Sequence, residues 1–140
     1  MKTITLEYHG VIYSKKNSKR IVTNQRSGKP MIISSETAKA QEMAMTWAFR
    51  DQAVKQQWFF EEDAKDYEGR RFIVDVQIWQ KDRTRRDLDN QLTAILDGLV
   101  SARALPDDSN KFIMHLGIDD MGIDKNDPRA TIEIIEVENE

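Results

Sequence analysis

With 140 residues, the chain has room for one domain with a single hydrophobic core. Its 39% hydrophobic and 32% charged residues exclude a disordered chain, and the absence of cysteine excludes disulfides and thiolate zinc sites. The net charge of −3 excludes a uniformly basic protein, and without a signal peptide or an apolar run of the roughly 20 residues that span a bilayer, we expect a cytoplasmic protein with no membrane partner.

The first half of the sequence predicts a strand, a hairpin and a long helix. Alternating apolar residues indicate a half-buried strand at 3–8. Two β-prone runs, 20–23 and 31–34, flank a linker that contains Ser27-Gly28-Lys29-Pro30, which is typical of a hairpin. Ser34 or Ser35 then supplies a helix N-cap, and the helix continues to about residue 57. We expect its apolar stripe to lie in the core, or in the core and a dimer face: Ala40, Met43, Ala44, Trp47, Ala48, Val54 and Trp58.

The second half predicts a strand, a helix and two further strands. After a polar connection at 61–69, alternation over 72–79 indicates a strand with one apolar face. An amphipathic helix follows from Asp87 to about Leu99, and then a turn at 106–110 and a strand at 112–118. After an Asp- and Gly-rich loop at 119–128, a strand at 130–137 closes the chain. This order predicts an α/β or α+β fold, with a small mixed β-sheet packed by two helices in one domain over 1–140.

Charge is distributed unevenly along the chain. Residues 1–60 contain ten Lys and Arg against four Asp and Glu, whereas residues 61–140 contain eleven against twenty. This distribution fits a protein that binds phosphates with one region and metal ions with the other. Acidic turns and an acidic tail that keep the protein soluble would produce the same distribution, and charge alone favours that simpler interpretation.

The segment Arg83–Asn90, with the sequence RTRRDLDN, places three arginines before two carboxylates at the start of the predicted helix. Asp87 as a helix cap and Asp89 in the first turn would need no function. A cap requires only one Asp, however, and Asp107 and Asp108 in a turn add two more carboxylates at another element boundary. Carboxylate oxygens are the hard ligands that Mg²⁺ prefers.

Phosphodiester hydrolysis would explain why basic and acidic residues occur together in this segment. A metal ion must activate water and offset the charge that develops on the phosphate, while its carboxylate ligands repel the DNA backbone. Arg85 and Arg86 are available to attract the phosphate. A second basic cluster supplies candidate DNA contacts, although such a run is more often a solvated loop: Lys15, Lys16, Asn17, Lys19 and Arg20.

These motifs resemble those of the RusA family of Holliday junction resolvases. The family's helix-opening RDLDN segment has its counterpart at 86–90, its continuation at Leu96-Asp97-Gly98-Leu99, and its Asp-Asp turn at 107–108. The polar segment 14–19, which precedes a hairpin and a long helix, also looks like the family's opening. The similarity covers most of the chain, and the combination of correctly spaced motifs is fairly specific.

The resemblance implies a homodimeric endodeoxyribonuclease of DNA recombination and repair, with 1–140 as a single RusA-like domain. Such an enzyme binds branched DNA and resolves four-way junctions by paired, symmetric cuts that depend on Mg²⁺, with Mn²⁺ as a substitute. Two identical sites match the approximate two-fold symmetry of a junction. Carried over by position, the essential carboxylates and metal ligands are Asp87, Asp89 and Asp108. Arg86 matches a basic residue beside the first carboxylate, and Asn17 matches an N-terminal Asn.

One position departs from the family's pattern. The family's catalytic lysine lies four residues after the second Asp, where this chain has Thr93. A lysine at 93 would share a helix face with Asp89 and Asp97 and reach toward the metal site. Thr93 lacks that charge, so Lys111 or an N-terminal lysine substitutes, or cleavage is weak, or the protein binds junctions without cutting well. We expect Lys111, three residues after Asp108, to be the catalytic substitute.

Other functions fit the sequence less well. The D-x-D motifs of sugar-nucleotide transferases and aspartyl phosphatases normally follow a hydrophobic strand, whereas this one follows Arg-Thr-Arg-Arg. The Asp-rich loops lack the Gly and Glu offsets of an EF-hand, and His9 and His115 lack zinc-like partners, so we expect structural or surface roles for both histidines. The remaining alternative is a non-catalytic junction- or DNA-binding dimer, whose aspartates serve folding or a structural metal site.

Overall fold

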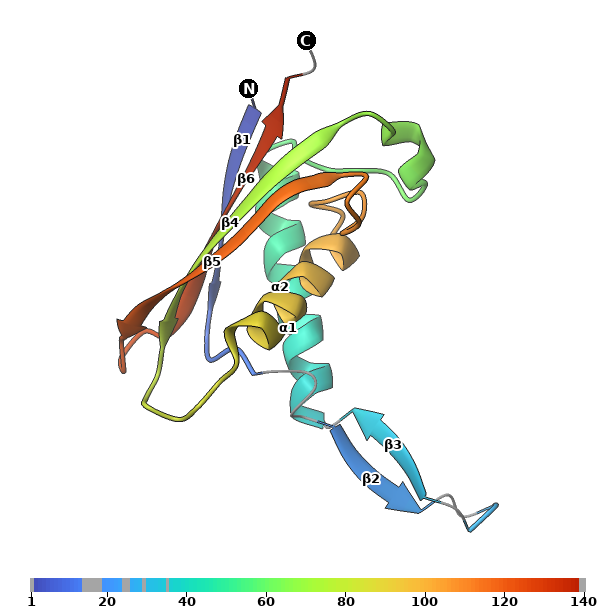
Figure 1. Ribbon diagram of the computed structural model, residues 1–140, viewed down its shortest axis with the longest axis vertical. Coiled ribbons are helices and arrows are strands. Elements are labelled where there is room, and N and C mark those ends of the chain that lie inside the picture. The colour runs from blue at the N-terminus through green and yellow to red at the C-terminus, as the bar shows by residue number, and fades with distance from the viewer. Residues whose placement is uncertain (1, 14–18, 24–25, 29, 35, 139–140) are drawn as a thin grey trace.

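Strands of alternating apolar and polar residues form a four-stranded sheet. The computed structural model describes residues 2–13, 19–23, 26–28, 30–34 and 36–138, and its larger sheet has the order β1-β6-β4-β5 (Figure 1). β4 and β5 are parallel and are joined through the helix α2, whereas β6 pairs antiparallel with both β1 and β4. The predicted mixed sheet in an α+β domain is therefore confirmed. Its elements are β1 (Lys2–His9), β4 (Arg71–Gln80), α2 (Leu88–Ser101), β5 (Ile113–Ile123) and β6 (Arg129–Val137).

The core lies between this sheet and two helices that cover one of its faces. In Figure 1, α1 (Glu36–Lys55) and α2 lie on the same side of the sheet, and the other side is open. Alternation along β4 buries Phe72, Val74, Val76 and Ile78, as predicted. Burial of these apolar surfaces is the main force that holds the helices on the sheet. Further core residues come from the other strands and from the helices: Ile4, Leu6, Met45, Phe49, Ile95, Leu99, Ile132 and Ile134.

A hairpin extends away from this body near the start of α1 (Figure 1). Its strands β2 (Lys19–Thr23) and β3 (Pro30–Ser34) pair antiparallel, as the turn signal predicted. Gly28 lies between them with φ of 69°, a left-handed conformation that glycine adopts without steric cost. The side chains of the two strands are outside the described part of the structure.

The apolar stripe predicted for α1 lies mainly on its outer side. Met43, Trp47 and Val54 are 64%, 65% and 53% exposed, and Ala40 and Ala44 are also exposed. These residues do not lie in the core of one chain, because α1 is apolar on two sides. The other predicted arrangement, a stripe shared between the core and a dimer face, stays a prediction. The side that packs on the core consists of Ala38, Gln41, Met45, Phe49 and Ala53.

Three further details differ from or add to the predicted elements. β5 continues to Ile123, so 119–123 is strand where a loop was predicted. The polar connection contains a short 3-10 helix, η1 (Ala64–Tyr67). Trp58 packs against the core, and its indole N–H donates to the carbonyl of Ala104 at 3.0 Å. Across the described ranges, the helices are too short or too polar for a membrane crossing.

Candidate metal and phosphate site at the ends of helix α2

The loop between β4 and α2 carries the arginines and leads into the first carboxylates. Its ends are fixed by Gln80 and Gln91, buried side chains that exchange hydrogen bonds of 2.9 and 3.1 Å. Within the loop, the Asp82 carboxylate accepts from the backbone N–H of Thr84 at 3.0 Å and from the guanidinium of Arg86 at 2.9 Å. The hydrogen bond from Arg86 is the main reason that the pKa of Asp82 lies below its ordinary value. The loop therefore has a defined local structure, in which the Arg86 side chain is only 11% exposed.

Asp87 and Asp89 lie at the start of α2 with accessible carboxylates. Asp87 is the extended N-cap residue, but its side chain makes no capping hydrogen bond. Instead, its Oδ2 accepts from the side-chain amide of Asn90 at 3.4 Å, and its Oδ1 lies 3.6 Å from Nε of Arg85. The carboxylate of Asp89 accepts from the backbone N–H of Asn90 at 2.9 Å, and Asp89 is exposed. Capping by the side chain therefore does not explain Asp87, and both carboxylates are open to a ligand.

Asp107 and Asp108 follow the C-terminal end of α2 and lie near Asp97 of that helix. Burial is the main cause that raises the pKa of Asp108, and the negative charges of Asp107 and Asp97 raise it further. Asp97 was not among the predicted site residues. The signal that would have found it is its spacing of two i,i+4 steps from Asp89, which places both on one helix face.

Within one chain, acidic residues extend from the start of α2 to its C-terminal end. We call them the acidic row: Asp87, Asp89, Asp97 and Asp108. Asp97 follows Asp87 by ten residues, which correspond to about 15 Å of helix axis at 1.5 Å per residue. In the described part of the chain, no three His, Asp or Glu side chains are grouped closely enough to hold a metal ion. Asp87 and Asp89 thus lie at one end of the row, and Asp108 lies at the other end beside Asp97. A single copy does not bring the three predicted ligands together.

A hollow of about 360 Å³ lies between the arginine-rich loop and the end of β5. Its exposed arginines, Arg83 and Arg85, suit a phosphate, which arginine binds through two parallel N–H donors, whereas the Arg86 guanidinium is bonded to Asp82. Arg83 belongs to this lining although it was not among the predicted DNA contacts, and its place in the run with Arg85 and Arg86 was the available signal. The lining residues are Gln80, Asp82, Arg83, Thr84, Arg85, Arg86, Asp120, Gly122 and Ile123.

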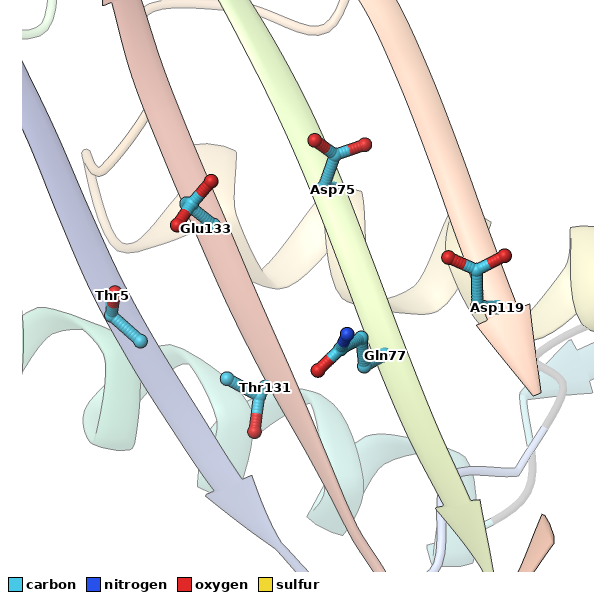
Figure 2. A pocket seen from close by; sticks show the side chains of 6 residues that line it. All are labelled: Thr5, Asp75, Gln77, Asp119, Thr131 and Glu133. Atoms are coloured by element: carbon cyan, nitrogen blue, oxygen red, sulfur yellow. The ribbon is translucent and has the colours of Figure 1, made fainter. Parts of the chain in front are cut away.

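The open face of the sheet has a second hollow of about 360 Å³, which is acidic. Figure 2 shows that the side chains from the four strands point to the same side: Thr5, Asp75, Gln77, Asp119, Thr131 and Glu133. Asp75 lies directly opposite Glu133 on β6, and Nε2 of His115 is 3.6 Å from Oδ1 of Asp75. The three carboxylates on this face repel a phosphate backbone. This face of the sheet is therefore unsuited to bind a phosphate backbone.

The predicted basic residues are described to different extents. Lys111 is exposed, in the turn where the N–H of Phe112 donates to the carbonyl of Ser109 at 3.0 Å. The predicted contacts at Lys15, Lys16 and Asn17 lie outside the described residues, and those at Lys19 and Arg20 fall in β2, where side chains are not described. The predicted role of the N-terminal cluster therefore stays a prediction.

The two histidines lie on the surface beside carboxylates. Nδ1 of His9 is 2.8 Å from Oδ1 of Asp127, and Nε2 is 3.2 Å from Oε2 of Glu7. The hydrogen bond with Asp127, followed by that with Glu7, raises the pKa of His9. His115 is likewise exposed next to Asp75. Both histidines therefore lie at the surface, each beside an acidic side chain.

Comparison with known proteins does not assign the chain to a family. No family model matches the chain, and no curated protein matches its sequence. The resemblance to the RusA family therefore rests on the spacing of the segments at 86–90, 96–99 and 107–108.

Proposed function

We propose that this protein is a divalent-metal-dependent endonuclease that cuts branched DNA, four-way junctions in particular. The observation that carries the proposal is the start of α2, where two accessible carboxylates follow the loop whose arginines line the hollow, and Asp87 lies 3.6 Å from Arg85. Carboxylates beside guanidinium groups suit a cation that is held against a phosphate. The RusA-like spacing of the motifs supports the same activity.

The donor chemistry of the acidic row fits a hard divalent cation. Asp87 and Asp89 would hold Mg²⁺, with Mn²⁺ as a substitute, because carboxylate oxygens are ligands that both ions accept. Asp108 would gain from a nearby positive charge, since its ionised form is disfavoured by burial and by Asp107 and Asp97. A divalent ion held by these carboxylates would supply an activated water and would stabilise charge on the phosphate.

The protein's own basic residues would bind and orient the phosphate. Arg83 and Arg85 are exposed at the hollow and can direct guanidinium N–H groups at phosphate oxygens. Arg86 is mostly buried and bonded to Asp82, so it holds the loop in position. Lys111 is our candidate for the positive charge that Thr93 does not provide. Activity that is unchanged in Lys111→Ala would eliminate that assignment.

We also propose that the enzyme acts as a cytoplasmic homodimer whose N-terminal basic segment contacts DNA. Paired cuts in a two-fold symmetric junction require two equivalent sites. A second copy would also offer a way to combine the two ends of the acidic row, which lie apart within one chain. The segment that would contact DNA comprises Lys15, Lys16, Asn17, Lys19 and Arg20.

Cleavage of a labelled four-way junction, compared with a matched linear duplex, tests the proposal. We expect symmetric nicks in the junction with Mg²⁺ and none with EDTA. Asp87→Asn and Asp108→Asn should abolish nicking, because each removes a proposed metal ligand. DNA should still bind, because each change removes a negative charge near phosphate. Glu133→Gln, on the opposite sheet face, is the matched control and should cut normally. Wild-type cleavage by either Asp variant would refute the site.

A non-catalytic DNA-binding protein is the second candidate function. The observation that favours it is the absence, among the described residues, of three acidic or histidine side chains grouped for a metal. Such a protein would bind the junction with or without a divalent ion and would leave it intact with both Mg²⁺ and Mn²⁺. The cleavage assay, read beside a binding assay on the same samples, distinguishes the two functions.

A further inference from the structure

Helix α1 presents a second apolar side that the protein's own core does not cover. Met43, Trp47 and Val54 are each more than half exposed, at 64%, 65% and 53%. A helix that packs only on its own domain needs one apolar stripe, and in α1 the stripe of Met45 and Phe49 already serves that purpose. The exposed side therefore has no role in the monomer's core.

The spacing of the exposed side is that of a coiled-coil seam. Ala40, Met43, Trp47, Arg50 and Val54 follow one another at intervals of three, four, three and four residues. Alternating intervals of this kind keep one line of side chains facing a second helix. Tryptophan, methionine and arginine are also the residue types enriched at protein interfaces. The exposed seam thus has both the geometry and the composition of a helix-pairing surface.

We propose that two copies of this chain associate through antiparallel packing of their α1 helices along this seam. In that arrangement Met43 lies opposite the partner's Val54, and Trp47 lies opposite the partner's Arg50. A guanidinium over an indole is a favourable cation–π contact. In the parallel arrangement Arg50 would instead oppose the partner's Arg50, which places like charges together at the seam. Charge therefore favours a reversed second copy over a parallel one.

Arg50 is already held in the monomer in a way that suits this contact. Its guanidinium lies 5.7 Å from the ring centre of Phe59, which is itself 40% exposed beyond the end of α1. Phe59 thereby limits the rotamers of Arg50, so less side-chain entropy is lost on pairing. Phe59 also extends the apolar surface beyond the helix. The seam and this aromatic side chain form one continuous candidate interface.

This inference deepens the proposed function by naming the surface that joins two copies. It rests on the proposed homodimer and not on the metal or cleavage chemistry. Sedimentation measures the association of two copies, whereas junction nicking measures nuclease activity. Failure of the dimer proposal is therefore distinguishable from failure of the proposed cleavage.

Analytical ultracentrifugation of the full chain over a concentration series tests the proposal. We expect a species of about twice 16.3 kDa. Trp47→Glu should raise the dimer Kd at least about 30-fold, as expected for an interface hot spot. Met114→Glu is the control, because Met114 is 51% exposed on β5 and should leave the dimer intact. Circular dichroism shows whether each variant is folded.

Two results would overturn the proposal. One is a wild-type chain that stays monomeric at the highest soluble concentration. The other is a dimer that survives in folded Trp47→Glu, or that is lost only in Met114→Glu, which would move the interface to the edge strand β5.

Disulfide trapping tests the antiparallel direction separately, because the natural chain has no cysteine. Met43→Cys and Val54→Cys are prepared as two single variants and oxidised alone or mixed. Antiparallel pairing predicts a mixed disulfide between the two variants in excess of either self-disulfide. Parallel pairing brings each position to its own copy, so preferential self-disulfides would refute the direction.

Discussion

The negative charge of Asp108, which its proposed role as a metal ligand requires, lowers the stability of the folded protein. Its carboxylate is partly desolvated, and Asp107 and Asp97 add negative charge nearby. A cation or a general charge-balancing partner would relieve this conflict, which is a common property of residues at functional sites. The same position follows α2 in the RusA-like Asp-Asp turn. Geometry and motif therefore single out the same residue for different reasons.

Asp108→Asn should increase the stability of the protein at neutral pH. Because the pKa of Asp108 is raised on folding, its carboxyl group contributes stability that is complete below the unfolded pKa and is lost as pH rises through the folded value. Removal of the charge should raise the free energy of unfolding by about 0.5 kcal/mol at pH 7, after discounting for solvent screening. The gain should vanish below about pH 4, the ordinary range of an Asp pKa. Urea unfolding across this range measures the difference, and a less stable variant at pH 7 would contradict the explanation.

At the scale of elements, buried glutamines determine where the segment after β1 lies. The Gln91 side chain of α2 donates to the carbonyl of Ile12 at 2.8 Å, and Gln41 of α1 both accepts from the N–H of Tyr13 and donates to its carbonyl. These amides satisfy backbone groups that no neighbouring strand pairs with in this described segment. They bring the residues that precede the N-terminal basic cluster next to both helices, and Gln91 also bonds Gln80 at the end of β4.

Gln91→Leu should lower the free energy of unfolding by about 1–3 kcal/mol. Gln91 is fully buried, and the change leaves the Ile12 carbonyl and the Gln80 amide without their partner. Chemical denaturation gives the value. The control is Gln77→Leu, on the exposed side of β4, which should change stability by less than about 0.5 kcal/mol. A double variant in which Gln80 is also Leu should cost less than the sum of the single changes, since both amides of the pair are then gone.

The elements that could be predicted from sequence are those with one buried face. β4 alternates cleanly, and α2 begins where its Asp87 cap position was predicted, so both were found with nearly correct bounds. β5 was predicted too short because Asp and Gly after Ile118 favour a loop locally, whereas pairing with β4 as far as Ile123 overrides that preference. The stripe on α1 was predicted to lie in the core, or in the core and a dimer face, because periodicity alone cannot rank two apolar sides of one helix.

The candidate site was predictable only in its local parts. The sequence places Asp87, Asp89 and the arginines together because they are neighbours in the chain. The position of Asp108 depends on how the turn after α2 folds back, and the structure places it beside Asp97 at the other end of the helix. No periodic pattern in the sequence predicts how the chain folds back after α2. A spacing argument could therefore name the carboxylates but could not say which of them lie together.

At the scale of the whole molecule, the protein consists of a packed body and a projecting basic arm. We call arm the sequence stretch 15–34, of which the structure describes 19–23, 26–28 and 30–34; this stretch contains six Lys and Arg and no Asp or Glu. Figure 1 shows its hairpin extended away from the sheet and from α2. A two-stranded hairpin without support is at best marginally stable in water. In the proposed nuclease, an arm of this charge would contact DNA, whereas the acidic open face of the sheet repels a polyanion.

Replacement of residues 15–34 by a short Gly-Ser linker should separate binding from folding. Tyr13 is held to α1 by hydrogen bonds of 2.6 and 2.8 Å with Gln41, so the two ends of the deletion stay close and the body should keep its thermal midpoint to within about 3 °C. Junction affinity, measured by fluorescence anisotropy, should fall at least about 10-fold, and its dependence on salt should become shallower because phosphate contacts are lost. A second variant that keeps the arm but changes its six basic residues to Gln should lose affinity similarly. If the Gln variant binds as wild type does while the deletion does not, the shape of the hairpin and not its charge binds DNA; if neither changes affinity, the arm is not a DNA contact.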